Sequence, residues 1–275
     1  MRRSRLAGAA LAGAVMSALP AAAGAWTLPE HGHYHKVSLS AFASDTEFDA
    51  EGEPQPFQFD GEYSDETLTY YGEFWLRDDL TLIASVPFKR IRYENFLERG
   101  TTQGLFDIEL GARWRFVERP VVVSLQCLTK LPGVYDEDDR LPLGNGQADV
   151  ELRVLLGHAP GRGRVYYGVE AAYRYRAEEP SDEWRWLLEV GGAIARRVYA
   201  RAKLDGIESA NNADDVQDVF GNPVATLSAE VVRLETTLGL RLGPRWSGEA
   251  TWAPILDGRS TADGTTVFLA GVYVF

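Results

Sequence analysis

The feature that most constrains this chain is a strict alternation of apolar and polar residues. From Phe106 to Phe116, apolar side chains take every second position, and Asp107, Glu109 and Arg113 lie between them. A period of two is typical of a β-strand, because successive side chains point to opposite faces. A helix would scatter the same residues around its axis. The alternation therefore predicts strands with one apolar and one charged face.

Twelve segments of the chain carry this pattern, and the connections between them fall into two classes. Five connections are short, and six are longer loops at about 44–65, 94–103, 132–146, 177–182, 210–226 and 257–263. Pro87 lacks an N–H donor and predicts a bulge in its segment. The segments are 33–43, 66–76, 80–93, 104–116, 120–131, 147–157, 164–176, 183–195, 197–209, 227–242, 245–256 and 264–275.

An even number of strands, with all long loops on one side, is typical of an outer-membrane β-barrel. A sheet in lipid must close on itself, because an open edge would leave unpaired backbone groups in hydrocarbon. We therefore expect an all-β fold: an antiparallel transmembrane barrel of about 12 strands, with short periplasmic turns and longer extracellular loops. The alternative is a soluble β-sandwich, whose polar face would have to be solvated.

Aromatic residues near the segment ends support the membrane interpretation, since Trp and Tyr concentrate at membrane–water interfaces. The residues in question are Trp75, Trp114, Tyr175, Trp184, Trp246 and Trp252. The last segment alternates up to Tyr273 and Phe275. We interpret this pair as the signal that the barrel-assembly machinery reads, with periplasmic chaperones acting earlier in biogenesis.

The first 25 residues have the layout of a secretory signal peptide. Three arginines precede an apolar run from Leu6 to Leu19, and Ala23-Gly24-Ala25 fits the small-residue cleavage pattern. The apolar run is too short to span a bilayer as a helix. We expect residues 1–25 to be removed during export through the inner membrane. Residues 26–275 then form one barrel domain in the cell outer membrane.

Charge and residue counts exclude several classes of function. The net charge of −12 would repel nucleic acid. A single cysteine, Cys127, cannot form an intrachain disulfide or a four-thiolate zinc site. None of the four histidines lies in an expected outer loop or mid-strand, so we expect no hydrolytic enzyme and no cofactor.

The charged face of the strands is expected to line the lumen. One interpretation is a polar pore that selects solutes by rings of charge. The other is a salt-bridged interior, closed or nearly so, that serves rigidity; a twelve-stranded bore allows either. The expected lumen-lining residues are Glu73, Asp107, Glu109, Arg113, Arg115, Glu151, Arg153, Glu170, Arg174, Glu189, Arg201, Lys203, Arg233, Glu235, Arg241 and Glu249.

The first long loop is acidic throughout, and Asp136–Asp139 repeats the theme in the third. Such a loop is expected to stay extended and hydrated. It could attract cations to the mouth, hold divalent cations against lipopolysaccharide phosphates, or only solvate the surface. The first-loop acids are Asp45, Glu47, Asp49, Glu51, Glu53, Asp60, Glu62 and Asp65.

Three histidines alternate at the start of the first strand. His31, His33 and His35 are weak candidates for a shared transition metal, because imidazoles at period two lie on one face. The alternative is a polar first strand at the periplasmic rim.

Several short motifs resemble a known family. Residues 26–32 (WTLPEHG), 106–113 (FDIELGAR), 130–133 (KLPG) and 143–147 (LGNGQ) are similar to the XagA-like outer-membrane proteins, within the broader "meta-pathway of phenol degradation" barrels. The resemblance implies a barrel that moves small, often aromatic or hydrophobic compounds, and it implies no catalytic residues.

Two functions follow from these observations. The first is a monomeric channel or transporter for small solutes. The second is a non-conducting structural barrel whose outer loops bind lipopolysaccharide, cations or surface partners. An open lumen would favour the first, and arginine–carboxylate pairs that close the lumen would favour the second.

Overall fold

The computed structural model describes residues 24–136, 139, 141–161, 164–177, 180–212 and 228–275, so most of the expected signal peptide lies outside it. Its strands are β1 (His33–Phe48), β2 (Pro54–Pro56), β3 (Glu62–Arg77), β4 (Leu80–Glu94), β5 (Arg99–Leu105), β6 (Ile108–Val117), β7 (Val122–Leu131), β8 (Asp149–His158), β9 (Val165–Arg176), β10 (Glu183–Ala193), β11 (Val198–Ser209), β12 (Glu230–Arg241), β13 (Trp246–Arg259) and β14 (Thr261–Val274). The described residues contain no helix long and apolar enough to cross a membrane.

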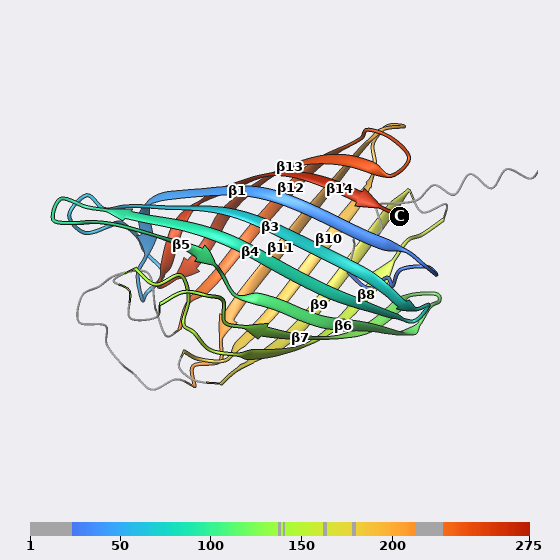
Figure 1. Ribbon diagram of the computed structural model, residues 1–275, viewed down its shortest axis with the longest axis horizontal. Helices are drawn as coiled ribbons and strands as arrows, with labels where there is room; N and C mark the ends of the chain where they lie inside the picture. Colours follow the sequence, from blue (N-terminus) through green and yellow to red (C-terminus); the bar gives the residue numbers. More distant parts are fainter. Residues whose placement is uncertain (1–23, 137–138, 140, 162–163, 178–179, 213–227) are drawn as a thin grey trace, which may run out of the picture.

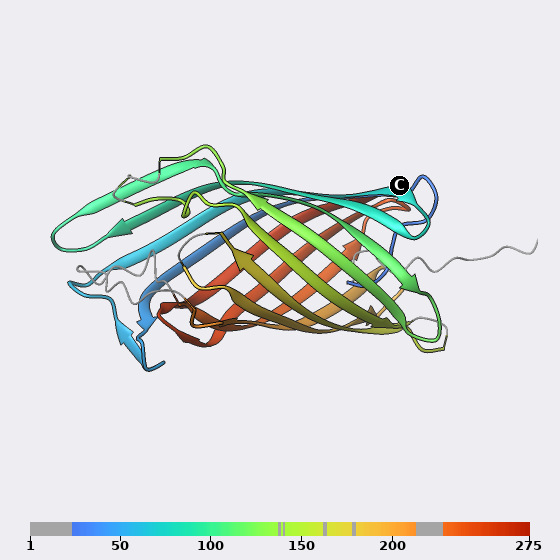
Figure 2. The same cartoon turned by 90° about the horizontal axis from the view of Figure 1, so that it is seen from below.

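The strands close into one antiparallel barrel (Figures 1 and 2). Tyr34 of β1 pairs with Val274 of β14 on one side and with Glu73 of β3 on the other, so the first and last strands meet. β5 and β6 both pair with β4 and share one position, and β2 pairs only with the end of β1. The described strands therefore occupy twelve positions, which confirms the predicted fold.

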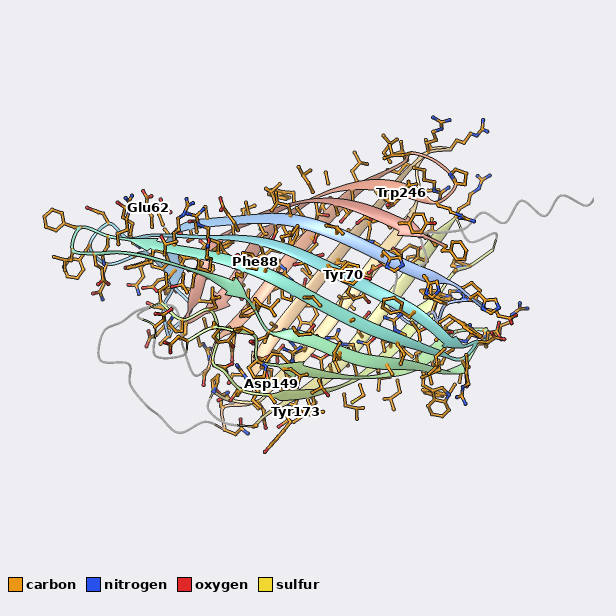
Figure 3. All side chains as sticks on the ribbon, viewed as in Figure 1. Glu62, Tyr70, Phe88, Asp149, Tyr173 and Trp246 are labelled. Atoms are coloured by element: carbon orange, nitrogen blue, oxygen red, sulfur yellow. The ribbon has the colours of Figure 1, made fainter. Side chains whose placement is uncertain are left out.

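The alternation in the sequence becomes the two faces of the wall. On β8, Glu151 is 1 % exposed, while its neighbours Val150 and Leu152 are 44 % and 53 % exposed. The same contrast recurs on the other strands, where large apolar side chains cover the outside and charged ones are buried (Figure 3, where Phe88 and Trp246 are labelled). An apolar exterior on a closed barrel suits a hydrocarbon surrounding.

Several strands run further than the sequence indicated, so three of the predicted long loops are wrong in part. β1 continues to Phe48 and β3 begins at Glu62; only residues 95–98 separate β4 from β5, and only Ser260 separates β13 from β14. Thr46–Phe48 pair with both β2 and β14. Apolar alternation ends where the apolar band ends, but polar residues pair their backbones equally well, so the ladder continues.

The bulge predicted at Pro87 lies on the neighbouring strand instead. β4 runs through Pro87 without a break. Phe88 pairs with Leu105, whereas Ser85 pairs with Glu109, so the partner chain has one extra residue there. The N–H of Phe106 donates to the carbonyl of Pro87 over 2.9 Å. Proline offers no N–H in return, so the partner chain absorbs the mismatch.

Candidate functional site

The end of the barrel with the short turns and the chain terminus is crossed by residues 24–30, named here the N-terminal segment. Its first half is packed against β7 and β8. Ala25 is fully buried with Val122 and Leu155, and its carbonyl accepts a 2.5 Å hydrogen bond from the hydroxyl of Ser124. Trp26 lies edge-on to Tyr166 of β9, with ring centroids 6.0 Å apart.

The second half of the segment reaches the far side of the bore. Leu28 is 2 % exposed and packs against Tyr34 of β1 and Val272 of β14. Its N–H donates to the hydroxyl of Thr81 on β4 over 3.0 Å. Arg113 of β6 donates to the carbonyl of Trp26 over 2.9 Å. The segment therefore touches both β9 and β14, which lie almost opposite each other in the ring of strands.

A dense group of arginines and carboxylates lines the middle of the wall. Glu151 is the centre of this group, with Arg153, Arg174 and Arg185 at 2.8, 3.0 and 3.1 Å. Arg153 also pairs with Glu170 at 2.5 Å, and Arg174 with Glu109 at 2.7 Å. Burying so many charges is tolerated only because each is paired.

Two further groups extend the network around the ring. Arg113 pairs with Glu73 at 3.1 Å, and both side chains are almost fully buried. Glu249 accepts from Lys36 at 2.9 Å and from Arg201 at 3.4 Å. These contacts join side chains from β1, β3, β6, β11 and β13.

The ion pairs run along the wall rather than across the bore. Among the described residues, every ion pair between two different strands joins strands at most three positions apart in the ring of twelve. The widest is Arg174 of β9 with Glu109 of β6. The predicted arginine–carboxylate pairs exist, but in this part of the chain they do not close the lumen from wall to wall.

The structure places the expected lumen-lining residues in three groups. The first group has nine buried residues: Glu73, Asp107, Arg113, Glu151, Glu170, Arg174, Glu189, Arg201 and Glu249. Five more are partly buried and ion-paired: Glu109, Arg153, Lys203, Arg233 and Glu235. The last two are partly exposed residues at the short-turn end: Arg115, which donates to the carbonyl of Asp78, and Arg241, whose own N–H donates to the carbonyl of Arg197.

Six further residues of the same network are not among the expected lumen-lining residues. They are Lys36, Lys130, Asp149, Arg176, Arg185 and Asp205. Each has the same parity along its strand as an inward neighbour, as Arg185 has with Glu189. If every second residue of a strand is taken to face the same side, the sequence predicts these residues as inward-facing too. The N-terminal segment carries no alternation and could not have been found this way.

At the other end, the chain after β7 folds back into the mouth. Leu141 and Leu143 are buried against Ile91 and Tyr93 on the inner face of β4. Asp107 accepts from the hydroxyl of Tyr135 and pairs with Lys130 at 3.0 Å. This third loop was expected to be an acidic, hydrated outer loop, and its acids Glu137 and Asp138 lie outside the described residues.

The first loop is folded back by a turn between strand residues, and its surroundings are not uniformly acidic. Asp65 lies on β3 and pairs with Lys89 of β4 at 2.7 Å. Asp49 accepts from the N–H groups of Glu51 and Glu53, which makes a turn. The loop contains no basic residues, but basic side chains of the adjacent strand, such as Lys89, pair with its acids. The negative charge of this region is therefore smaller than the loop sequence alone indicates.

The three histidines do not share one site. His33 and His35 stack with ring centroids 6.1 Å apart among the aromatic rings of Phe74, Tyr70 and Phe275, while the exposed His31 packs on Trp75. Within the described ranges, no group of three or more His, Cys, Asp or Glu is placed to hold a metal ion.

One expected interfacial aromatic is an exception to its group. Trp75 has the inward parity of Glu73 and packs against the cluster of Leu28, Tyr34 and Val272. The other five aromatics of that group are 46–56 % exposed.

No protein-family model matches the chain, and no curated protein matches it. Among solved structures, it is similar to the COG4313 outer membrane channel from Pseudomonas putida F1, with a TM-score of 0.73 and 18 % identity over 91 % of this chain and 98 % of that one. It is also similar to the translocator domain of the autotransporter NalP from Neisseria meningitidis, with a TM-score of 0.51 and 11 % identity over 90 % of each chain. At these identities the likeness shows the fold, that of an outer-membrane barrel.

Proposed function

We propose that the protein is an outer-membrane channel for small solutes whose periplasmic opening is closed by its own N-terminal segment. The observation that carries this proposal is the contrast between wall and bore. The ion pairs stiffen the wall without crossing it, and the element that crosses is a short, non-strand segment. A segment held by a few hydrogen bonds and two small apolar clusters can leave more easily than a strand can, because leaving breaks no ladder.

The substrate class belongs to the same proposal. The solved structure with the higher TM-score is itself described as an outer membrane channel. The motifs that resemble the XagA-like and meta-pathway barrels favour aromatic or hydrophobic compounds. Membership of the XagA-like group rests on those motifs alone. Liposome-swelling rates for a small aromatic acid and a sugar of similar size test this point: faster entry of the aromatic acid is expected, and equal or reversed rates would remove the aromatic assignment.

The channel itself is tested by single-channel recording in planar bilayers across a salt gradient. A mature protein that begins at Gly24 is compared with a variant that lacks residues 24–29, which all precede β1. We expect rare or small openings for the mature protein and larger, longer openings for the deletion. The replacement Trp26→Ala should move partway in the same direction. Thr27→Ala serves as a matched control, because its hydroxyl reaches only the exposed carbonyl of Asp78.

Two outcomes would contradict the proposal in different ways. Equal conductance of both proteins would mean that the N-terminal segment does not close the bore. Silence from a correctly folded deletion variant would favour the structural barrel, with lipopolysaccharide or other surface partners at its outer loops. The dense paired wall is the feature that favours this second candidate, since paired charges on neighbouring strands rigidify a barrel.

A further inference from the structure

Ala25 is buried in the barrel interior and Gly24 lies partly buried beside it, although the small-residue pattern at 23–25 would assign both to the removed signal peptide. Ala25 is 0 % exposed, and its carbonyl accepts from the hydroxyl of Ser124, which is also 0 % exposed. A cut after Ala25 would take this acceptor away and leave a buried hydroxyl without it, which is unfavourable.

Side chains and a glycine of the barrel wall lie in close contact with the segment at these two residues. A side chain on Gly157 of β8 would approach Trp26 to 2.7 Å and Ala25 to 3.0 Å, so glycine is needed there. Gly24 has a φ of +53°, a conformation that favours glycine. The Oε1 atom of Glu170 lies 2.8 Å from where a Cβ of Gly24 would be. The amide nitrogen of Gly24 is bonded to the same Cα, so it lies within about 5 Å of that oxygen.

The sequence offers a second cleavage pattern two residues upstream. Ala21-Ala22-Ala23 also places small residues at the last and third-last positions before a cut. We propose that signal peptidase cuts between Ala23 and Gly24, and that the new terminal ammonium of Gly24 pairs with Glu170 inside the barrel. In this hydrolysis the Ala23–Gly24 peptide bond breaks, water supplies hydroxide to the Ala23 carbonyl carbon, and protons convert the Gly24 nitrogen to an ammonium group.

The charge around Glu170 suits an additional cation. Glu170 is 9 % exposed, and its arginine partner, Arg153, is shared with Glu151. The uncut precursor has a neutral amide at Gly24. A free α-amino group, with an ordinary pKa of about 7.7–8.0, is largely protonated at neutral pH. Processing would thus create the charge that holds the N-terminal segment in the bore, whether or not the lumen conducts.

The first test is the intact mass of the protein purified from outer membranes, with sequencing of its terminal peptide. The expected mature chain begins at Gly24. A chain that begins at Trp26, or anywhere else, would overturn the proposal.

A pair of leader variants tests the same cut independently of folding, because both changed residues are removed. Ala21→Leu places a large residue at the third-last position before the proposed cut, and it should slow processing or move the cut. Ala22→Leu changes the unrestricted position between and should process normally. Unchanged processing of Ala21→Leu would contradict a cut after Ala23.

The ion pair is tested by the reactivity of the terminal amine toward an acylating reagent, read from the mass of the terminal peptide. In the folded mature protein the amine should react several-fold more slowly than in the unfolded chain. Glu170→Gln should raise the native rate, and Glu51→Gln, at an exposed turn, should not. Equal rates in folded and unfolded protein would exclude a partly buried, paired ammonium even if the cut is where we place it.

Discussion

The ion-paired residues of this barrel differ greatly in burial, and we expect them to differ in how much they stabilise the fold. Arg113 and Glu73 are almost fully buried, and Arg113 also holds the carbonyl of Trp26. Arg233 has the same kind of partners, Asp205 and Glu235, but its side chain is 36 % exposed. Water cannot solvate a buried charge that loses its partner, whereas it can solvate a half-exposed one.

We therefore expect Arg113→Ala to lower the free energy of unfolding by about 3–5 kcal/mol, because it leaves Glu73 charged and buried. Arg233→Ala should cost much less. Thermal unfolding in detergent micelles, followed by circular dichroism, measures both. The double replacement Arg113→Met with Glu73→Leu should regain most of the loss. Equal destabilisation by the two alanine variants would contradict the buried assignment of Arg113.

Asp182 ties two outer loops together at the long-loop end. It accepts from the hydroxyl of Tyr173 at 2.6 Å, the N–H of Arg176 at 2.7 Å and the amide of Asn212 at 2.8 Å. Burial opposes ionisation, but these hydrogen bonds outweigh it and hold the pKa of Asp182 below its usual value. A lowered pKa means that the folded state is favoured when the carboxyl is ionised.

This stabilisation should be present at neutral pH and disappear as the pH falls below about 4, the ordinary pKa of aspartate. Asp182→Asn should therefore lower the melting temperature at pH 7, and the difference from wild type should shrink as the medium is acidified through that range. Melting curves between pH 7 and pH 2.5 measure it, with Glu51→Gln as an exposed control. A difference that stays constant with pH would show that the carboxylate charge is not what matters.

At the scale of strands, aromatic rings repeatedly cover glycines on the adjacent strand. The pairs Tyr199–Gly239, Tyr166–Gly191 and Trp186–Gly206 are direct cross-strand neighbours in the ladders. In each, an added Cβ would approach the aromatic side chain to 2.0–2.4 Å. A ring lying flat on a glycine fills the space the missing side chain leaves, and it fixes the register of the two strands.

Gly239→Ala should push Tyr199 from its place and weaken its 2.8 Å hydrogen bond to Glu249. We expect a loss of about 1–3 kcal/mol in unfolding free energy, the usual cost of overpacking. Gly271→Ala is the matched control, since an added Cβ there meets nothing within 4 Å. If the two variants melt alike, the ring does not depend on its glycine.

The same strands show what the sequence could and could not predict. The apolar residues of β8 and β9 alternate cleanly, so their position and inward faces followed from parity. The outer parts of β1, β3 and β13 have polar residues on both faces, so their backbone pairing left no periodic signal. The N-terminal segment is irregular, and its place depends on contacts with five or more separate strands, which no local pattern records.

At the scale of the whole molecule, Phe275 follows the end of β14 and lies beside the start of β1. Phe275 is 55 % exposed, with Arg245 over its ring, and its backbone pairs with His33 of β1. Its side chain therefore adds little to the folded barrel. We propose that Tyr273 and Phe275 are read during assembly, and that the Phe275 side chain serves recognition more than stability.

Phe275→Ala should accordingly reduce the amount of protein in outer-membrane fractions several-fold, while the refolded variant melts close to wild type. Phe116→Ala is the control, because Phe116 is a comparably exposed aromatic near the same rim, at 50 %. Quantitative immunoblots of membrane fractions, together with melting curves, separate the two effects. Equal membrane levels of both variants would count against the recognition role.

The unequal strand lengths give the mouth of the barrel a slanted rim. β1 and β3 have 16 residues, whereas β7 and β8 have 10 (Figure 1). At about 3.3 Å per residue and a tilt near 45°, one side of the wall stands about 14 Å higher than the other. In a bacterial envelope the high side would rise into the surface sugars as a screen, while the low side stays level with the lipid. Incoming molecules would then approach over the low side of the wall. A compound dissolved in the membrane surface would travel a shorter distance to the mouth than a compound that approaches from the surrounding medium.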